Sequence, residues 1–498
     1  MLEGRIKDHK LQIVSDKKTI KEMTNEFSTL EPGYQYNPRV RSGFSDGRYK
    51  FYKLFNIPEN KDLAIMELEL GFIQRVNRYF NSIVVGTPQQ FTKDEITLFL
   101  KKEIPNLPFK LRKYQLKMIY GMLQSERHLG ILSTGGGKSL VAYLVIKFLI
   151  ENNWKSILVV PTINLVDQMY SDFLAYGASE DFLNSIQRIG GDYKDKKLKG
   201  DIVISTWQSL KNLKKDINEY QCLLIDEAHK AKADVLNGIL KTNIQKKIGM
   251  TGSMPIIKID SMKLEEIFGE PKIYANAKDL IELGLLTKTS IIAVFLNYPR
   301  KDTRASWKYQ QESKFIREYP KRLEYTANLI NKVSNSGITV ATFNTSKFGE
   351  ELYEKVSGKK LGKDRNSFER QKACGVFFIS GKTKPELREK IRLYLNSEIS
   401  TDEKLIAQTT TIDTGINIPK LKNFVFAEFP GKSFTKILQS IGRVMRKSED
   451  SGDSVYVWDI VDCFDYTNEN YTLKHFWDRQ KFYEAEGHPI HEKEIQLE

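Results

Sequence analysis

A glycine-rich loop between two apolar segments most restricts how this chain can fold. Residues 128–132 have the character of a buried strand, and residues 140–150 that of a buried helix. The loop 132–139 reads Leu-Ser-Thr-Gly-Gly-Gly-Lys-Ser, so its N–H groups can cradle a phosphate while Lys138 and Ser139 contact phosphate and Mg²⁺. The alternative, a chance glycine-rich turn, is disfavoured by both flanks. The candidate nucleotide-binding residues here are Thr134, Gly135, Gly136, Gly137, Lys138 and Ser139.

A pair of carboxylates ends another apolar strand, about 90 residues further along the chain. Asp226 is the expected second Mg²⁺ ligand beside Ser139, and Glu227 is the expected group that orients and deprotonates the attacking water. Taken alone, Asp-Glu-Ala-His could instead be the acidic first turn of a helix. The phosphate loop upstream favours ATP hydrolysis, with Lys138, Asp226 and Glu227 as catalytic residues.

The order of expected elements indicates the fold class, which is α/β. Apolar runs alternate with helical stretches, the pattern that builds parallel sheets. A first series of strands is expected near 129–133, 156–160, 202–205, 222–226 and 247–250, and a second near 338–343, 375–379, 404–408, 423–427 and 454–459. The sequence therefore predicts a small α+β module at 1–105, parallel-sheet lobes at 106–286 and 287–462, and a helical tail at 463–498.

The N-terminal module has a turn-rich centre in which aromatic and basic residues alternate. Arg39, Arg41 and Arg48 lie among the aromatic residues of the segment 34–48. Guanidinium groups hold phosphates and aromatic rings stack on bases, so this composition suits nucleic-acid binding. The alternative is a solvated β-hairpin whose aromatic residues belong to the core.

Composition limits the partners and the compartment. The chain has 498 residues, with 77 Lys plus Arg against 63 Asp plus Glu, and this net charge of +14 favours a polyanionic partner. Charge alone leaves nucleic acid and an acidic protein open. The three cysteines do not suggest a disulfide framework, and we see no secretory leader or membrane-spanning run. We therefore expect a cytoplasmic protein with no membrane partner.

With these residues in view, the chain resembles the superfamily 2 helicases. Leu-Arg-Lys-Tyr-Gln at 111–115 matches their adenine-reading motif, which implies that Gln115 contacts the base. Thr-Gly-Ser at 251–253 resembles the motif that senses the nucleotide state. The resemblance implies two tandem RecA-like lobes, with ATP and Mg²⁺ as cofactors. Positions that resemble the family's nucleic-acid contacts are Pro161, Thr162, Gln168, Thr206, Gln208, Ser380, Gly381, Thr409 and Thr411.

Two further motifs fall in the second lobe. Residues 413–417 match the motif that faces ribose and phosphate through Gly415, although Asn417 stands where the family usually has Asp. Gln439, Arg443 and Arg446 match the family's last motif, which implies a catalytic role near the γ-phosphate. The two arginines are about one helical turn apart, so both can project from one face. The alternative is a basic helix end that complements the helix dipole.

The N-terminal module, in particular residues 36–39 and 46–48, resembles that of phage helicases of the UvsW kind. Residues 457–459 resemble the C-terminal strand of the same helicases. This implies an ATP-dependent DNA helicase or translocase that remodels branched DNA by fork regression, branch migration and duplex unwinding. Its partners would be single-stranded DNA, forks, junctions and replication or recombination proteins, and the chain would act as a monomer in the host cytoplasm. The alternatives are an RNA or RNA–DNA hybrid remodeller, the motor subunit of a restriction system, and an adaptor that binds ATP without turnover.

Overall fold

The computed structural model shows two compact units, Met1–Asn276 and Ala277–Glu498. It describes residues 3–7, 10–80, 91–191, 193, 197–210, 216–231, 233–255, 257–286, 288–304, 306–412, 418, 420–429, 454–465, 469–485 and 487–497. Among these residues, no helix is long and apolar enough to cross a lipid bilayer.

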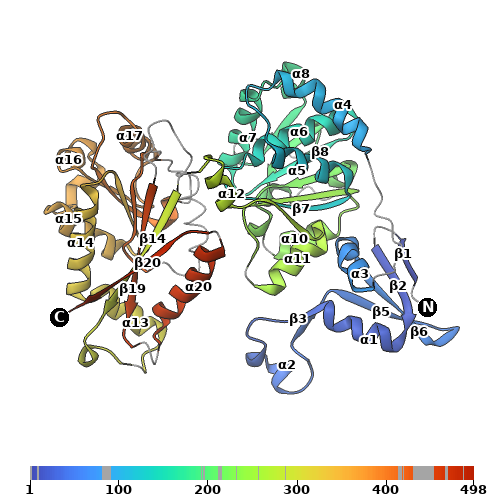
Figure 1. Ribbon diagram of the computed structural model, residues 1–498, viewed down its shortest axis with the longest axis horizontal. Coiled ribbons are helices and arrows are strands. Elements are labelled where there is room, and N and C mark those ends of the chain that lie inside the picture. Colours follow the sequence, from blue (N-terminus) through green and yellow to red (C-terminus); the bar gives the residue numbers. More distant parts are fainter. Residues whose placement is uncertain are drawn as a thin grey trace. The chain divides into compact units, whose positions relative to one another are not determined.

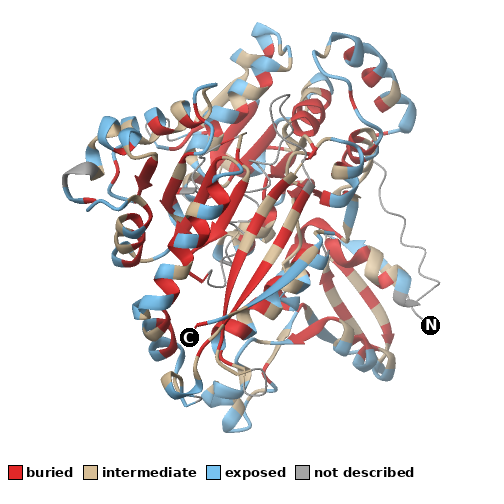
Figure 2. Ribbon diagram, turned by 60° about the vertical axis from the view of Figure 1, so that its left-hand side comes forward, coloured by how far each residue is buried: buried red, intermediate tan, exposed pale blue. Residues whose placement is uncertain are grey.

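The first unit begins with a small α+β module. Its antiparallel sheet contains, in spatial order, β1 Glu3–Lys7, β2 Lys10–Asp16, β6 Asn60–Glu69 and β5 Tyr52–Ile57. Burial alternates along β2, as period-two side-chain geometry requires for a sheet with one covered face (Figure 2). Helix α1 Lys17–Glu26 begins where the Asp16 carboxylate accepts a hydrogen bond from Thr19 N at 2.9 Å.

A two-stranded pair extends the module at one end. Strand β3 Ser28–Leu30 pairs with β4 Arg48–Lys50, and the connection between them contains the 3₁₀ turn η1 Tyr34–Tyr36 and the short helix α2 Pro38–Arg41 (Figure 1). The remaining elements, η2 Leu70–Phe72 and α3 Ile73–Phe80, follow β6.

The rest of the first unit is a seven-stranded sheet in which every pairing is parallel. Helices cover both of its faces (Figure 1). The strand order is β13 Pro271–Ala275, β7 Arg127–Leu132, β12 Lys246–Thr251, β11 Cys222–Ile225, β8 Ser156–Val160, β10 Ile202–Thr206 and β9 Ile186–Ile189. The main helices are α4 Lys93–Glu103, α5 Lys113–Gln124, α6 Lys138–Glu151, α7 Ile163–Ala175, α10 Ala233–Leu240 and α11 Lys258–Phe268. Because the strands are parallel, the loops at their carboxyl ends meet at one edge.

The N-terminal module packs against α11 of this sheet domain. Ile259 and Met262 of α11 belong to the same buried cluster as the module's own core. A Cβ on Gly71 would overlap the carbonyl oxygens of Glu265 and Glu266, so only glycine allows this close approach. Arg75 holds the Glu265 carboxylate in a bidentate pair, with N–O distances of 2.7 and 2.5 Å. Helix α11 of the sheet domain therefore contributes two residues to the core of the module.

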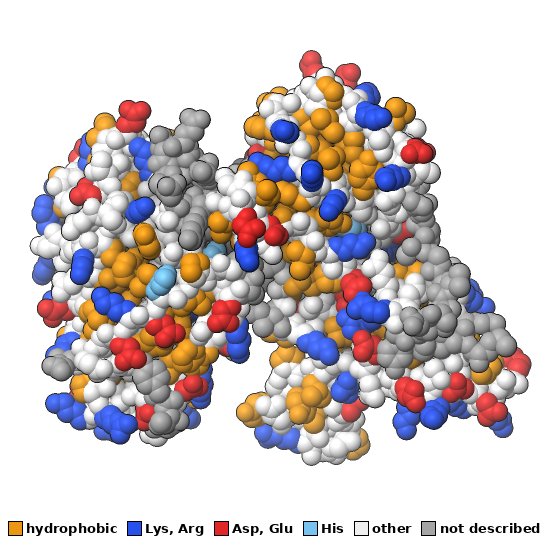
Figure 3. Space-filling view, in the orientation of Figure 1, with side chains coloured by type: hydrophobic (Ala, Val, Ile, Leu, Met, Phe, Trp, Pro, Cys, Tyr) orange, Lys and Arg blue, Asp and Glu red, His pale blue; other side chains and the backbone are white. Residues whose placement is uncertain are grey.

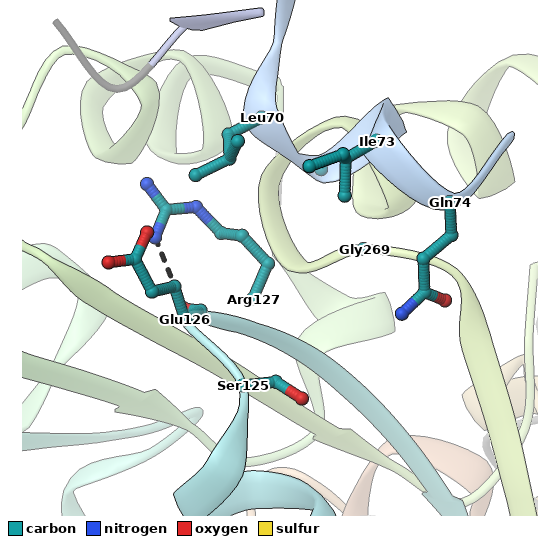
Figure 4. A pocket seen from close by; sticks show the side chains of 8 residues that line it. Leu70, Ile73, Gln74, Ser125, Glu126, Arg127 and Gly269 are labelled. Carbon is teal, nitrogen blue, oxygen red and sulfur yellow. Dashed lines mark hydrogen bonds between the residues drawn. The ribbon is translucent and has the colours of Figure 1, made fainter. Parts of the chain in front are cut away.

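A small pocket lies along the same contact. Leu70, Ile73 and Gln74 of the module line it on one side, and Arg127 and its neighbours line the other (Figure 4). The Arg127 guanidinium donates to the carbonyls of Glu126 at 3.1 Å and Gln245 at 2.5 Å, and burial lowers its pKa to about 10.

The second unit contains another seven-stranded sheet with only parallel pairings. Leu405 and Ile406 of one strand pack into different apolar clusters, so the sheet has a core on each face. The strand order is β16 Val376–Ile379, β17 Lys404–Gln408, β15 Thr339–Phe343, β18 Asn423–Phe426, β19 Ser454–Cys463, β14 Lys288–Asn297 and β20 Ile490–Gln496. Its helices include α12 Ala277–Glu282, α13 Tyr309–Glu318, α14 Pro320–Ser334, α15 Ser346–Ser357, α16 Phe368–Ala373, α17 Pro385–Leu395, α18 Thr409–Ile412 and α20 Tyr471–Ala485.

The predicted fold class is confirmed: two α/β lobes with parallel sheets follow a small α+β module. The units divide after Asn276, whereas the sequence placed the end of the first lobe at residue 286. The prediction of a purely helical tail is wrong at its end. Helix α20 is present, but β20 adds a strand that pairs in parallel with β14, which is otherwise an edge strand.

Candidate active site

The glycine-rich loop joins β7 directly to α6. Gly135 and Gly137 have φ values of 86° and 84°, in the left-handed region that side chains with a Cβ disfavour. A Cβ on Gly136 would lie 2.5 Å from Leu132, so this position also requires glycine. The loop backbone therefore lies directly at the amino end of α6, where N–H groups have no helical partner and attract anions.

Lys138 connects the loop to the acidic strand end. Its Nζ donates to Leu132 O at 3.0 Å and lies 3.5 Å from Glu227 Oε1. Both charged side chains are largely buried, at 10% and 7% exposure, so water screens their attraction only weakly. Lys138 therefore has its charge at the point where a phosphate cradled by the loop would lie.

Asp226 is a buried carboxylate beside another one. Its backbone N donates to Val159 O at 2.9 Å, which fixes it at the end of β11. Burial and the neighbouring Glu227 charge raise the pKa of Asp226 to about 6, and Lys138 partly offsets this. Asp226 Oδ1 is buried and has no hydrogen-bond partner among the residues that the structure describes. This oxygen is suited to a divalent cation.

A hydrogen-bond chain leads from the carboxylates to the end of β12. The Thr251 hydroxyl donates to Ser253 O at 2.7 Å, so it accepts the 2.6 Å bond from His229 Nδ1. The same ring nitrogen lies 3.4 Å from Glu227 Oε2. A Cβ on Gly252 would be 3.6 Å from Lys138 Nζ, so the 251–253 segment adjoins the glycine-rich loop.

Gln115 lies beside the loop and is buried. Its Nε2 donates to Gly136 O at 2.9 Å, and its Oε1 accepts from Arg112 N at 2.9 Å. The Tyr114 hydroxyl donates to the same Gly136 oxygen at 3.2 Å. In this structure, Gln115 therefore braces the loop backbone, a role that the adenine-reading motif did not suggest.

Tyr176 contacts Ser139, a contact that the sequence analysis missed. The two hydroxyl oxygens are 2.6 Å apart. No short motif links the two residues, because they are 37 positions apart in the sequence.

The expected nucleic-acid contacts of the first unit follow β8 and β10. Thr162 and Gln168 are exposed at the start and middle of α7, with Pro161 partly exposed, and Gln208 is exposed after β10. Thr206 is buried, and its hydroxyl lies 3.0 Å from that of Ser209. Strand β8 pairs in parallel with β11, and β10 pairs in parallel with β8. The loops that follow β8 and β10 therefore lie at the same carboxyl edge of the sheet as Asp226.

The corresponding residues of the second unit form a connected network. The Gln408 side chain accepts from Gly381 N at 2.9 Å and donates to Asn344 O at 3.3 Å, which links three strand ends. Thr409 donates to Phe343 O at 3.0 Å. The other members of this network are Ser380, whose carbonyl accepts from Arg388 at 3.1 Å, and Thr411, whose hydroxyl donates to Gln408 O at 2.6 Å. Gln408 and Arg388 were not among the sequence candidates.

Four predicted site residues lie outside the described part of the chain. These are Gly415, Gln439, Arg443 and Arg446.

The three arginines of the N-terminal module have different surroundings. Arg48 is engaged within the fold: it donates to Ser28 Oγ at 2.9 Å and to Ser28 O at 3.1 Å. Arg39 and Arg41 are exposed. Beside them, Tyr36 is 70% exposed and Phe44 88% exposed, and Arg41 lies over the Tyr36 ring at 5.9 Å. Hydrophobic and basic side chains share the surface at this end of the module (Figure 3).

Comparison with known proteins matches both lobes. Residues 108–256 match the family described as type III restriction enzyme, res subunit, and residues 323–448 match the helicase conserved C-terminal domain. The chain is 27% identical to the ATP-dependent DNA helicase UvsW of Enterobacteria phage T4, over 96% of this chain and 95% of that protein.

Two further similarities are weaker. A putative helicase 22 of a Sulfolobus islandicus filamentous virus is 24% identical over 71% of this chain and 64% of that protein. A fragment of a putative HsdR subunit of a type I restriction enzyme from Vibrio vulnificus has the same fold, with a TM-score of 0.57 and 19% identity, covering 87% of this chain and 78% of that chain.

Proposed function

Because this chain is a superfamily 2 helicase resembling UvsW, we propose that it is an ATP-driven motor that remodels branched DNA by fork regression, branch migration and duplex unwinding. The observation that supports the ATP-driven part of the proposal is the meeting of the glycine-rich loop, Lys138 and the Asp226–Glu227 pair at one sheet edge, and the similarity to UvsW supports the DNA part. A phosphate loop beside a buried acidic strand end supports ATP hydrolysis.

Different residues of the first unit have different roles in ATP hydrolysis. Lys138 neutralises the β- and γ-phosphates, and the N–H groups of the loop hold them in place. Ser139 and Asp226 would hold Mg²⁺, which supplies charge stabilisation for phosphoryl transfer when bound. Among the described residues no group of three or more His, Cys, Asp or Glu side chains could hold a metal. Two protein ligands suit Mg²⁺, which keeps water and phosphate oxygens in its shell.

Glu227 orients the attacking water and accepts its proton in this proposal. The positive φ of 51° at Glu227 turns the chain sharply after β11, and Lys138 and His229 flank its carboxylate. His229 and Thr251 extend the contact to the 251–253 segment, which supports a link between the water-activating group and the neighbouring loop.

Nucleic acid would be held by hydroxyl groups and backbone amides at strand ends of both units. In the second unit, Gly415, Gln439, Arg443 and Arg446 are assigned to ATP binding and hydrolysis in this proposal. The nucleic-acid contacts are assigned to Pro161, Thr162, Gln168, Thr206, Gln208, Ser380, Gly381, Thr409 and Thr411.

The N-terminal module would choose branched substrates. Exposed Arg39 and Arg41 can bind phosphates of a second duplex arm while Tyr36 and Phe44 stack on bases at the junction. Arg48, which the sequence grouped with them, has a structural role at Ser28 that competes with this use.

The test replaces Arg39 and Arg41 together with Ala and measures regression of a model replication fork. Fork regression should fall strongly while ATP turnover with single-stranded DNA is retained. The slope of log junction affinity against log salt concentration should fall in magnitude by roughly one per lost phosphate contact. The matched control replaces Lys17 and Lys18 on α1, which removes the same charge from another exposed part of the module. Equal loss in both variants would remove the assigned role from the arginine segment.

A second candidate is the motor subunit of a restriction system, because residues 108–256 match a restriction-enzyme family. Such a motor would be stimulated by linear duplex DNA at least as strongly as by forks. A preference for forked DNA in the same turnover assay separates the two functions.

A further inference from the structure

We propose that Tyr176 is a positioning residue for the Mg²⁺ site, because it holds the Ser139 hydroxyl in the orientation that presents its lone pairs to the cation. The inference rests on the proposed function, since it concerns the same site. Its geometric basis is the 2.6 Å distance between the two hydroxyl oxygens.

A serine hydroxyl has one proton and two lone pairs, so the direction of the proton decides which lone pairs are available. An oxygen acceptor at 2.6 Å fixes that proton along one line. If Ser139 donates to Tyr176, its lone pairs point away from Tyr176. Without the acceptor, the hydroxyl can rotate and direct its proton toward the cation site. Partners of this kind orient metal ligands and raise the affinity of the site.

The structure holds Tyr176 firmly in place. It is the C-cap residue of α7, and its backbone N donates to Asp172 O at 2.9 Å. Its ring packs against Tyr143 with centroids 5.8 Å apart, and against Phe109 at 6.0 Å. Tyr143 is buried and follows Ser139 by one turn of α6, so the same two helices carry the ring contact and the hydroxyl contact.

Helix α7 also connects two functional regions. It begins directly after Thr162, in the loop assigned to nucleic-acid binding, and ends at Ala175, directly before its C-cap residue Tyr176. Its 13 residues span roughly 20 Å as one rigid element. A shift at the start of α7 when DNA binds would therefore reach the Ser139 hydroxyl through Tyr176.

The test is a Mg²⁺ titration of fluorescent ATP-analogue binding to the full chain and its variants. Tyr176→Phe keeps the ring and removes only the hydroxyl. We expect the Mg²⁺ concentration for half-saturation to rise about tenfold, with Mg²⁺-free nucleotide binding unchanged. Tyr170→Phe is the matched control, because Tyr170 lies on the same helix with its ring against Arg188 instead.

A double-mutant cycle separates positioning from a general packing defect. In a Ser139→Ala background, Tyr176→Phe should add no further change, because the hydroxyl that it orients is absent. An unchanged half-saturation in Tyr176→Phe, or an equal loss in the Ser139→Ala background, would overturn the inference. Failure of the wild-type chain to bind nucleotide in a Mg²⁺-dependent way would instead count against the proposed function.

Discussion

At the scale of single residues, the candidate site concentrates charge that the fold does not need. Asp226 and Glu227 are both buried, and Lys138 Nζ lies 3.5 Å from Glu227 Oε1. Lys138 and Lys230 favour the charged form of Asp226, but burial and the neighbouring Glu227 charge outweigh them, so a bound cation would relieve the remaining cost. The buried carboxylates therefore lower the stability of the folded protein while they allow it to bind a cation.

Asp226→Asn should stabilise the Mg²⁺-free protein while abolishing hydrolysis. The folded-state pKa of Asp226, about 6, lies above its usual 3.8. Between these pH values the folded chain binds more protons than the unfolded chain, so the free energy of unfolding falls as pH rises. The full destabilisation by the buried Asp226 charge is present above about pH 6. Asn removes the penalty, so melting should occur at higher temperature at about pH 8 and the gain should shrink toward about pH 4.

Thermal melting without metal or nucleotide measures this effect. Asp201→Asn is the control, since Asp201 is exposed and its replacement should change little. A melting temperature of Asp226→Asn below that of the wild type at about pH 8 would show that the buried Asp226 carboxylate does not destabilise the folded protein.

Arg443→Ala tests the assignment made to the second unit. The nucleotide contacts of the first unit remain in this variant, so ATP should still bind. Turnover should fall by about 10³ or more if Arg443 neutralises charge in the transition state. The measurement is ATP hydrolysis at saturating DNA together with nucleotide affinity, and near-normal turnover would remove Arg443 from the catalytic set.

Local sequence patterns identified only part of the site. The glycine-rich loop and the Asp-Glu pair each lie within a few consecutive residues, so their spacing could be read directly. Tyr176 could not be found in this way, because its contact with Ser139 depends on how α6 and α7 pack. The structural bonds of Arg48 to Ser28 were hidden for the same reason.

At the scale of elements, the strand–helix alternation was sufficient to predict both parallel sheets. It also predicted a strand near 247–250, where β12 lies, but it could not predict that Lys246 and Lys247 at the start of this strand are buried. Lys246 donates to the carbonyls of Met122 and Leu123, at the end of α5, at 3.0 Å each. Lys247 points to the other face and donates to Ile239 O of α10 at 3.0 Å. Each lysine donates to carbonyl groups at a helix end that have no partner within the helix. These contacts depend on tertiary packing, so no pattern of neighbouring residues in the sequence predicts them.

The packing of η2 against α11 gives a prediction for Gly71. Gly71→Ala should separate the N-terminal module from α11, because the added Cβ would overlap two backbone carbonyls that cannot move aside independently. The cost should be about 1–3 kcal/mol, the usual range for overpacking. Gly238→Ala is the matched control: it lies within α10 with nothing within 4 Å of the new Cβ, and should be neutral or slightly stabilising.

Chemical denaturation of both variants measures the difference. Equal stability of Gly71→Ala and the wild type would mean that the module does not rest on α11 as closely as the structure indicates.

At the scale of the whole molecule, the N-terminal module belongs to the first unit and shares a buried cluster with α11. Removing residues 1–104 would expose Ile259 and Met262 of α11, so point substitutions test the module more cleanly than truncation. The sequence predicted three separate segments before the tail, because domain boundaries were inferred from changes in the pattern of expected strands and helices. The shared core with α11 depends on long-range contacts and could not be seen there.

The proposed function requires that DNA, and branched DNA most of all, stimulates ATP hydrolysis by this chain. The most direct measurement is the ATP turnover rate with single-stranded DNA, linear duplex, forks, four-way junctions and RNA, with Lys138→Ala as the inactive control. We predict stimulation by every DNA that offers a single strand, the greatest stimulation by forks and junctions, and little by RNA. Turnover that is independent of DNA, or stimulated more strongly by RNA, would contradict the account.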